Sequence, residues 1–298
     1  MKSLVTGGCG FIGSHIVDEL ISSGHEVVVI DNESAESNEK FYKNKKAKYY
    51  KYDIIDYDSI ESLFEDVDYV FHLAAESRIQ PTLERPQDAC MTNFYGTCNV
   101  LQASRKYKIK RVIYSSTSSA YGLNDKMPLT EDMERDCLNP YSVTKVAAED
   151  LCKMYYTLWG LPTIILRYFN IYGERQPVKG QYAPVIGIFL RQKQAKEKLT
   201  IVGDGSQRRD FTHVLDVVQA NINASKTIYQ NAFGRIFNIG TGKNHSVKEV
   251  ADMISKKQIF IEPRLGEAEN TLADITQACN FLNYKPTINL EDWVQSQL

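Results

Sequence analysis

The sequence lacks the features that mark membrane, secreted and nucleic-acid-binding proteins. No apolar run approaches the roughly 20 residues of a membrane-spanning helix. The N-terminal segment MKSLVTGG reaches glycine too early for a signal peptide. The formal charge is −2, and acidic and basic residues are spread along the chain without a basic stripe. We therefore expect a cytoplasmic protein without nucleic-acid or membrane partners.

The spacing of the cysteines and histidines also argues against a metal site. The six cysteines contain no CxxC pair, and none of the five histidines pairs at ligand spacing. We therefore expect reduced thiols and no bound metal.

Short apolar segments alternate with helix-length segments over the first part of the chain. The expected strands are Lys2–Thr6, Glu26–Ile30, Tyr49–Tyr52, Tyr69–Leu73, Arg111–Tyr114 and Thr163–Arg167. The expected helices are Phe11–Ser23, Ser59–Glu65, Gln87–Tyr107 and Pro140–Trp159. Buried strands that alternate with crossover helices predict an α/β fold with a Rossmann-type doubly wound parallel sheet.

A glycine-rich loop follows the first expected strand. In TGGCGFIG, Gly7, Gly10 and Gly13 have nearly the dinucleotide-loop spacing, with one more residue between the first pair than in GxGxxG. Such glycines permit a tight turn and close approach of backbone N–H groups to a pyrophosphate. Asp31 ends the next strand, where a carboxylate accepts hydrogen bonds from the adenosine ribose and repels the extra phosphate of NADP. The loop therefore predicts NAD binding, although Asp31 also fits a simple turn residue.

The chain is divided on this basis into two parts. Residues 1–170 are predicted to form an NAD-binding Rossmann domain that carries the catalytic residues. After residue 170 the alternation loosens, with Gly-rich turns in GDGSQ and IGTG. Residues 171–298 are predicted to form mainly a smaller C-terminal α/β substrate-binding lobe, with a strand and a helix free to return to the first domain.

The segment NPYSVTK places Tyr141 and Lys145 four residues apart after a helix-start signal. Asn139 suits an N-cap and Pro140 a first helical position, so the tyrosine and the lysine share one face. A tyrosine with a pKa near 10 is a poor base at neutral pH, and bringing it to about 7 takes roughly 4 kcal/mol. A neighbouring lysine and the helix end act in that direction. By itself the pair also fits a surface contact of no consequence.

Several motifs in a fixed order carry a resemblance to a known family. They are TGGCGFIG, Asp31, Leu73-Ala74-Ala75, SSTSSAYG, the YxxxK pair, RYFNIYG, GDGSQRRDFTHV and PRLGE. With these motifs the whole chain resembles the extended short-chain dehydrogenase/reductase family, in its nucleotide-sugar epimerase/dehydratase branch. The pattern is most similar to UDP-glucose/UDP-N-acetylglucosamine 4-epimerases.

The resemblance implies roles for the catalytic set. Tyr141 would be the general base, and Lys145 would hold the nicotinamide ribose and lower the tyrosine pKa. Thr117, in SSTSSAYG, would relay the proton. It also implies further cofactor contacts from Phe11, Ile12, Asn32, Asp53, Ile54, Leu73, Ala74, Ala75, Ser77, Asn93, Ser115 and Tyr168. For Ser77 and Asn93 an ordinary loop role remains an equal alternative.

The residues after Thr117 separate the reactions of this branch. Its 4,6-dehydratases carry an Asp-Glu pair there, because elimination of water needs an acid and a base. Ser118 and Ser119 stand in those places and would contact the sugar instead. The resemblance then implies C4 epimerisation of a UDP-hexose. A glucuronate epimerase or decarboxylase remains an alternative, with Arg78 as an open candidate for a cation near C6.

The same resemblance assigns the substrate lobe. The implied contacts to the UDP-sugar are Asn170, Thr200, Val202, Arg209, Arg264, Glu267 and Thr271. Glu267 replaces the usual aspartate on the nucleoside ribose. Thr271 occupies a position where a bulky residue excludes a 2-acetamido group and a small one admits it. We therefore expect UDP-GlcNAc and UDP-GalNAc to be accepted along with UDP-glucose and UDP-galactose.

The family usually dimerises through two helices that match Gln87–Tyr107 and Tyr141–Trp159, so a homodimer is expected. The apolar residues offered for this face are Met91, Phe94, Val100, Leu101, Leu151, Met154, Tyr155 and Leu158. Two other interpretations stay open. A non-catalytic dinucleotide sensor should lack part of the catalytic set, which is complete here. A redox enzyme would exchange NAD in every cycle.

Overall fold

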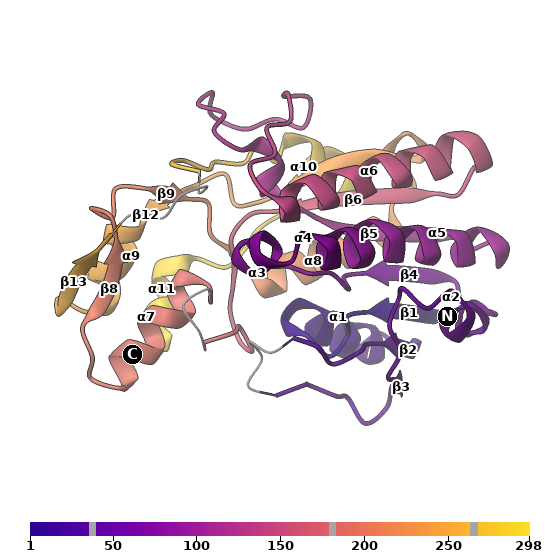
Figure 1. Ribbon diagram of the computed structural model, residues 1–298, viewed down its shortest axis with the longest axis horizontal. Coiled ribbons are helices and arrows are strands. Elements are labelled where there is room, and N and C mark those ends of the chain that lie inside the picture. Colours follow the sequence, from indigo (N-terminus) through magenta and orange to yellow (C-terminus); the bar gives the residue numbers. More distant parts are fainter. Residues whose placement is uncertain (36–39, 179–182, 263–267) are drawn as a thin grey trace.

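A parallel sheet of seven strands forms the centre of the computed structural model, which describes residues 1–35, 40–178, 183–262 and 268–298 (Figure 1). The strand order is β11-β6-β5-β4-β1-β2-β3. The strands are β1 (Lys2–Thr6), β2 (Glu26–Ile30), β3 (Lys48–Tyr50), β4 (Tyr69–His72), β5 (Arg111–Thr117), β6 (Thr163–Tyr168) and β11 (Arg235–Ile239). The predicted Rossmann-type fold is confirmed.

Helices cover both faces of this sheet. One face carries α1 (Phe11–Ser22), α8 (Val214–Lys226) and α10 (Thr276–Leu282). The other carries α2 (Tyr57–Ile60), η1 (Glu61–Phe64), α5 (Thr97–Lys106) and α6 (Pro140–Trp159). Successive strand side chains point to opposite faces, so Leu4 and Val5 enter different cores. Burial on both faces explains why these strands are almost continuously apolar.

The predicted start of α6 is confirmed. Asn139 Oδ1 accepts a hydrogen bond from the backbone N–H of Ser142 at 2.9 Å, and Pro140 is the first helical residue. The single helix predicted over Gln87–Tyr107 is wrong in detail. That stretch contains most of α4 (Pro86–Ala89), a π-helical segment η2 (Cys90–Gly96) and α5. The backbone therefore widens at the point where this segment packs against α6.

A second hydrophobic core lies at the carboxyl edge of the sheet. It is built by α7 (Val185–Gln194), β8 (Leu199–Val202), α9 (Val247–Ile254) and α11 (Leu290–Ser296), around buried side chains such as Phe189. The remaining elements are α3 (Ile79–Glu84), η3 (Ser118–Tyr121), β7 (Ile171–Tyr172), β9 (Arg208–Arg209), β10 (Thr212–His213), η4 (Gln230–Ala232), β12 (His245–Ser246) and β13 (Gln258–Ile261). Residues 171–298 also contribute β11, α8 and α10 to the sheet layers. The division at residue 170 stays a prediction.

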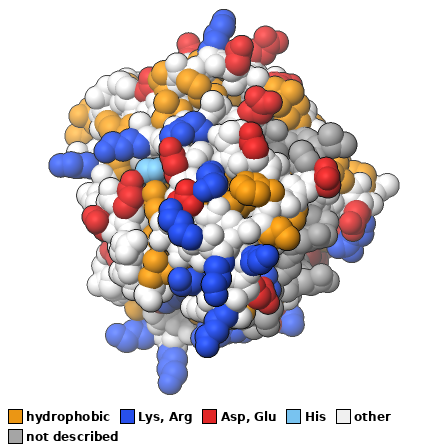
Figure 2. All heavy atoms as spheres, turned by 90° about the vertical axis from the view of Figure 1, so that its left-hand side faces the viewer, with side chains coloured by type: hydrophobic (Ala, Val, Ile, Leu, Met, Phe, Trp, Pro, Cys, Tyr) orange, Lys and Arg blue, Asp and Glu red, His pale blue; other side chains and the backbone are white. Residues whose placement is uncertain are grey.

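Figure 2 views the molecule from the end that carries this smaller core, and Lys and Arg side chains there are interspersed with Asp and Glu. On β13, Ile259, Phe260 and Ile261 are 45%, 54% and 39% exposed. Within the described ranges, no helix combines the length and apolar character needed to cross a membrane. The same residues contain no cluster of three or more His, Cys, Asp or Glu that could hold a metal ion.

Candidate active site

One cavity of about 650 Å³ lies between the carboxyl edge of the sheet and the smaller lobe. In doubly wound folds, ligands bind at this edge of the sheet. The cavity is lined by the glycine loop, by the ends of β4, β5 and β6, and by β8 and β9 of the lobe. The loops from both parts of the chain thus form one continuous site.

The glycine loop has the shape that a pyrophosphate requires. Gly7 has a φ of +71°, and a Cβ there would lie 2.8 Å from the backbone nitrogen of Ala74. A Cβ on Gly13 would lie 2.1 Å from the carbonyl oxygen of Gly7, so both positions need glycine. The N-cap residue of α1, Gly10, offers no side-chain cap. The first N–H groups of α1 therefore remain for an anion in the cavity, which the loop lines.

Asp31 lies beside this loop and is held in place by it. Its carboxylate accepts hydrogen bonds from the backbone N–H groups of Cys9 at 2.9 Å and Glu33 at 2.8 Å. Burial raises the pKa of Asp31, and these two bonds act in the opposite direction. Next to it, Asn32 Nδ2 donates to Asp53 Oδ2 at 2.8 Å. These polar groups form the part of the cavity wall that suits an adenosine.

Most of the other predicted cofactor residues also line the cavity. They are Phe11, Ile12, Ile54, Leu73, Ala74, Ala75, Ser77, Ser115 and Tyr168. Ser115 Oγ lies 2.8 Å from the hydroxyl of Tyr168. Asn93 does not line the cavity. Its side chain is fully buried, exchanges hydrogen bonds with the backbone of Glu76 at 2.8 and 3.0 Å, and donates to Thr144 Oγ1 at 3.0 Å. It holds the loop after β4 against α6 rather than facing a ligand.

A buried histidine that the sequence analysis missed supports the glycine loop. The Thr97 hydroxyl donates to the carbonyl of Asn93 at 2.6 Å, so it accepts from His72 Nε2 at 2.8 Å. His72 Nδ1 is then the acceptor for the Thr6 hydroxyl at 2.6 Å, while Thr6 Oγ1 accepts from Ala74 N at 3.2 Å. Burial lowers the pKa of His72 to about 3, so the ring stays neutral. This chain joins the ends of β1 and β4 beneath the cavity.

Thr117, Tyr141 and Lys145 all line the cavity beside the end of β5 and the start of α6. The Thr117 hydroxyl accepts from the backbone N–H of Ser119 at 3.0 Å and lies near the Tyr141 phenol. Lys145 Nζ lies 4.3 Å from the centre of the Tyr114 ring. The structure thus brings the predicted hydroxyl, phenol and ammonium groups into one site.

The pKa of Tyr141 differs from the expectation. Burial raises the pKa of this phenol, and the neighbouring Thr117 hydroxyl acts in the opposite direction. Burial also lowers the pKa of Lys145, to about 7. We expected Lys145 to lower the pKa of Tyr141. Considering only the groups of the protein, this expectation is wrong, because the causes of the shift are burial and Thr117. The protein groups therefore leave Tyr141 a poor base at neutral pH.

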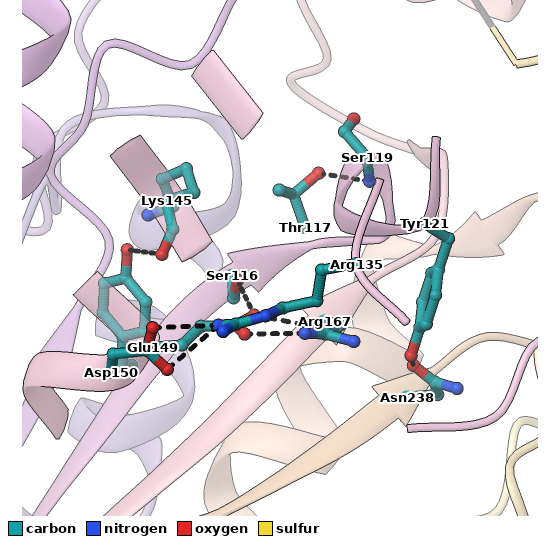
Figure 3. A network of polar contacts seen from close by, with 11 residues as sticks. Ser116, Thr117, Ser119, Tyr121, Arg135, Lys145, Glu149, Asp150, Arg167 and Asn238 are labelled. Carbon is teal, nitrogen blue, oxygen red and sulfur yellow. Dashed lines mark hydrogen bonds and ion pairs between the residues drawn. The ribbon is translucent and has the colours of Figure 1, made fainter. Parts of the chain in front are cut away.

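A buried ion pair fixes the catalytic elements relative to one another (Figure 3). Glu149 on α6 accepts from Arg167 Nε at 2.8 Å and Nη2 at 2.7 Å, and from Ser116 Oγ at 2.6 Å. Ser116 precedes Thr117 on β5, and Arg167 lies on β6 over the Tyr121 ring at 4.7 Å. Glu149 therefore joins the helix of Tyr141 and Lys145 to β6 through Arg167, and to β5, the strand of Thr117, through Ser116. The sequence signal was the arginine in RYFNIYG.

On the substrate side, Asn170 and Thr271 form one hydrogen-bonded unit. Asn170 Nδ2 donates to Thr271 Oγ1 at 3.1 Å and to the carbonyl of Asp210 at 3.2 Å, which leaves the amide oxygen to accept from a ligand. Thr271 Oγ1 also accepts from the backbone N–H of Asp210 at 3.2 Å. Both residues line the cavity. The threonine side chain is consequently held in one orientation at its wall.

The other residues predicted to contact the substrate lie after β5 and in the smaller lobe. Ser118, Ser119, Thr200, Val202 and Arg209 line the cavity. Arg208, by contrast, bonds Asn244 Oδ1 at 2.9 Å and the carbonyl of Asn244 at 2.9 Å. Arg209 is therefore the arginine of this pair that reaches the site.

Two predicted substrate residues, Arg264 and Glu267, lie outside the described residues. Conversely, the sequence analysis missed several residues that line the cavity, among them Phe41, Glu76, Gln207 and Phe211. Gln207 and Phe211 stand within GDGSQRRDF, a motif from which only Arg209 was predicted to contact the substrate. Phe41 stands in the lysine-rich segment after β2, where nothing in the pattern marks a binding residue.

The fold, the uncapped helix behind the glycine loop and the acidic residue after β2 define a Rossmann-fold dinucleotide-binding protein. Residues 3–240 match the NAD dependent epimerase/dehydratase family. The chain belongs to this family, and its cofactor is NAD.

Named relatives cover almost the whole chain. A putative UDP-glucose 4-epimerase of Methanocaldococcus jannaschii is 39% identical over 98% of this chain and 95% of its own length. A UDP-N-acetyl-α-D-glucosaminuronate decarboxylase of Bacillus cytotoxicus is 36% identical over 100% of this chain and 96% of its own. The crystal structure of UDP-glucose 4-epimerase of Thermotoga maritima with UDP-glucose is 35% identical, with a TM-score of 0.93 over 99% of this chain and 96% of that one.

Proposed function

We propose that this protein catalyses the NAD-dependent C4 epimerisation of a UDP-hexose. The observation that carries the proposal is the meeting of Thr117, Tyr141 and Lys145 with the glycine loop in one cavity. The similarity to UDP-glucose 4-epimerases over nearly the whole chain supports the same reaction. A dinucleotide sensor without activity would not need this catalytic set.

Tyr141, Thr117 and Lys145 have different roles in the proton transfer. Tyr141 removes the proton of the C4 hydroxyl, and the neighbouring Thr117 hydroxyl favours the phenolate by lowering the pKa of this phenol. NAD, when bound, supplies the acceptor and later the donor of the C4 hydride. Tyr141 returns the proton after the 4-keto sugar has turned over, so the configuration at C4 inverts. Burial lowers the pKa of Lys145 to about 7, so its positive charge is present below this pH and is lost as the pH rises above it.

The cavity favours epimerisation over dehydration. The two positions after Thr117 carry Ser118 and Ser119, which line the cavity and offer hydroxyls to a sugar. Hydroxyl groups do not readily supply the acid and base that elimination of water requires at neutral pH. Oxidation followed by re-reduction at the same carbon is then the reaction that remains.

Thr271 supports acceptance of N-acetylated substrates. Its hydroxyl accepts hydrogen bonds from Asn170 and from the backbone N–H of Asp210. These bonds fix the small side chain at the cavity wall. Replacing Thr271 with Tyr should lower turnover of UDP-GalNAc by about tenfold or more and affect UDP-galactose less. Equal losses on both substrates would contradict this role.

The test of the reaction is proton NMR of the purified protein with UDP-galactose and, separately, with UDP-GalNAc, without added reductant. Epimerisation predicts that the anomeric signals move to a gluco/galacto equilibrium without net formation of NADH. A 4-keto-6-deoxy product would show a dehydratase. Unchanged spectra with both substrates would reject epimerisation of neutral UDP-hexoses.

We also propose a homodimer that uses the outer surface of η2 and α6. Met91, Phe94 and Leu158 are 46%, 41% and 63% exposed there. The inclusion of Val100, Leu101 and Tyr155 in this face was wrong, because those side chains are buried in the core beside the sheet. Light scattering coupled to size exclusion at micromolar protein should give the mass of two chains. A monomer would contradict the proposal.

A further inference from the structure

Arg78 lies in the cavity wall, in the loop that follows the central strand β4. It follows Ser77 in the loop between β4 and α3, and it lines the cavity. Since β4 lies between β1 and β5, this loop lies between the glycine loop and the strand that ends in Thr117. The helix that begins directly after Arg78 packs against α6, which carries Tyr141. Arg78 is thus placed at the end of the cavity where the chemistry occurs.

No residue that the structure describes balances the charge of Arg78. Among the described residues, its guanidinium has no ion-pair or hydrogen-bond partner. Burial lowers the pKa of Arg78, although an arginine keeps its proton. By comparison, Arg209 donates to the carbonyls of Arg208 at 3.0 Å and Glu269 at 3.1 Å. A half-buried cation without an anion is costly, so a ligand in the cavity is the natural source of its partner.

The other anionic groups of the ligands already have partners in the site. The free N–H groups of α1 suit the pyrophosphate of the dinucleotide, and Arg209 of the lobe suits the diphosphate of the substrate. The remaining position is beside the sugar. Carbon C6 is two bonds from the reacting C4, so a group that touches C6 must lie close to Thr117 and Tyr141. The loop of Arg78 lines the same cavity as Thr117 and Tyr141, and it leads into the helix that packs against α6.

We propose that Arg78 binds a carboxylate at C6 of the sugar, so that the site accepts UDP-hexuronates as well as neutral UDP-hexoses. The planar guanidinium matches a carboxylate with two parallel hydrogen bonds. This inference rests on the proposed function for the orientation of the sugar. It makes Arg78 a specificity residue rather than a group in the proton transfer.

The test measures binding, so that it does not depend on turnover. The NAD-loaded Tyr141→Phe protein is titrated calorimetrically with UDP, UDP-glucose and UDP-glucuronate, with and without the additional change Arg78→Gln. Loss of a charged hydrogen-bonded pair predicts that Arg78→Gln weakens UDP-glucuronate about 10- to 100-fold. UDP and UDP-glucose should stay within about threefold.

Arg85→Gln is the matched control, because Arg85 is a nearby surface cation paired with Asp88 at 3.3 Å and 67% exposed. It should leave all three affinities unchanged. Arg78→Lys should recover part of the UDP-glucuronate affinity, which a loss of folding would not. Equal losses for UDP, UDP-glucose and UDP-glucuronate would place Arg78 on a phosphate and overturn the proposal, as would unchanged binding of UDP-glucuronate.

The two proposals fail separately. If wild-type protein epimerises UDP-glucose but Arg78→Gln shows no selective loss, only the role of Arg78 is rejected. If wild-type protein converts no neutral sugar but the selective loss is found, the carboxylate site stands and the proposed reaction on neutral hexoses fails.

Discussion

Replacing Glu149 with alanine should lower the free energy of unfolding by about 3–5 kcal/mol, because it removes one partner of a buried ion pair. Glu149 and Arg167 have 0% and 1% exposed side chains. The variant leaves the guanidinium buried against the Tyr121 ring and removes the acceptor of the Ser116 hydroxyl. Three hydrogen bonds to the carboxylate are lost together.

The assay is urea denaturation at neutral pH, followed by circular dichroism. Glu149→Gln keeps the shape and removes the charge, so it should lose less than alanine. The double variant Glu149→Met, Arg167→Met removes both charges. It should recover much of the lost stability, because the attraction within a buried ion pair offsets little more than the desolvation of its two charges. A loss below about 1 kcal/mol for Glu149→Ala, as for a surface pair, would refute the reasoning.

Three further predictions concern the active site. Burial lowers the pKa of Lys145 to about 7. Between pH ~7 and ~10.5 the unfolded chain therefore binds a proton that the folded protein lacks, and the free energy of unfolding rises with pH. In NAD-free protein, the stability advantage of Lys145→Met over wild type should therefore shrink across this range; a constant difference in denaturation experiments would contradict the shift. Tyr141→Phe should lower turnover about 10²- to 10⁴-fold and leave NAD affinity nearly unchanged, and turnover close to wild type in the NMR assay would exclude Tyr141 as the base. Asp31→Asn should weaken NAD and raise the relative affinity for NADP, because the repelling charge is lost; an unchanged ratio in titrations of both would argue against its contact with the ribose.

Much of the sheet domain was predictable because its signals are local. The bounds of Lys2–Thr6 and Glu26–Ile30 follow from apolar runs that end at turn residues, and the start of α6 follows from Asn139 and Pro140. These features need only the chemistry of neighbouring residues. The π-helical segment Cys90–Gly96 was not predictable, because a π segment has no distinct sequence period and depends on packing.

Motifs in the sequence single out Thr117, Tyr141 and Lys145, and the structure places all three in one cavity. Residues that hold another group were either missed, as was His72, or expected at the cofactor, as was Asn93. Asn93 is fully buried and bonds the backbone of Glu76, and His72 joins Thr6 to Thr97. Such partners come from distant parts of the chain, so sequence spacing does not reveal them. The direction of the Tyr141 pKa shift also depended on burial, which the motif does not contain.

The central claim is that hydride leaves C4 and returns to the same carbon. UDP-galactose labelled with deuterium at C4 tests it most directly, with the product UDP-glucose analysed by NMR and mass spectrometry in ordinary water. If the same hydride returns to C4, the label is retained at C4 of the product. Replacement of the label by solvent hydrogen, or no conversion of UDP-galactose, would contradict it.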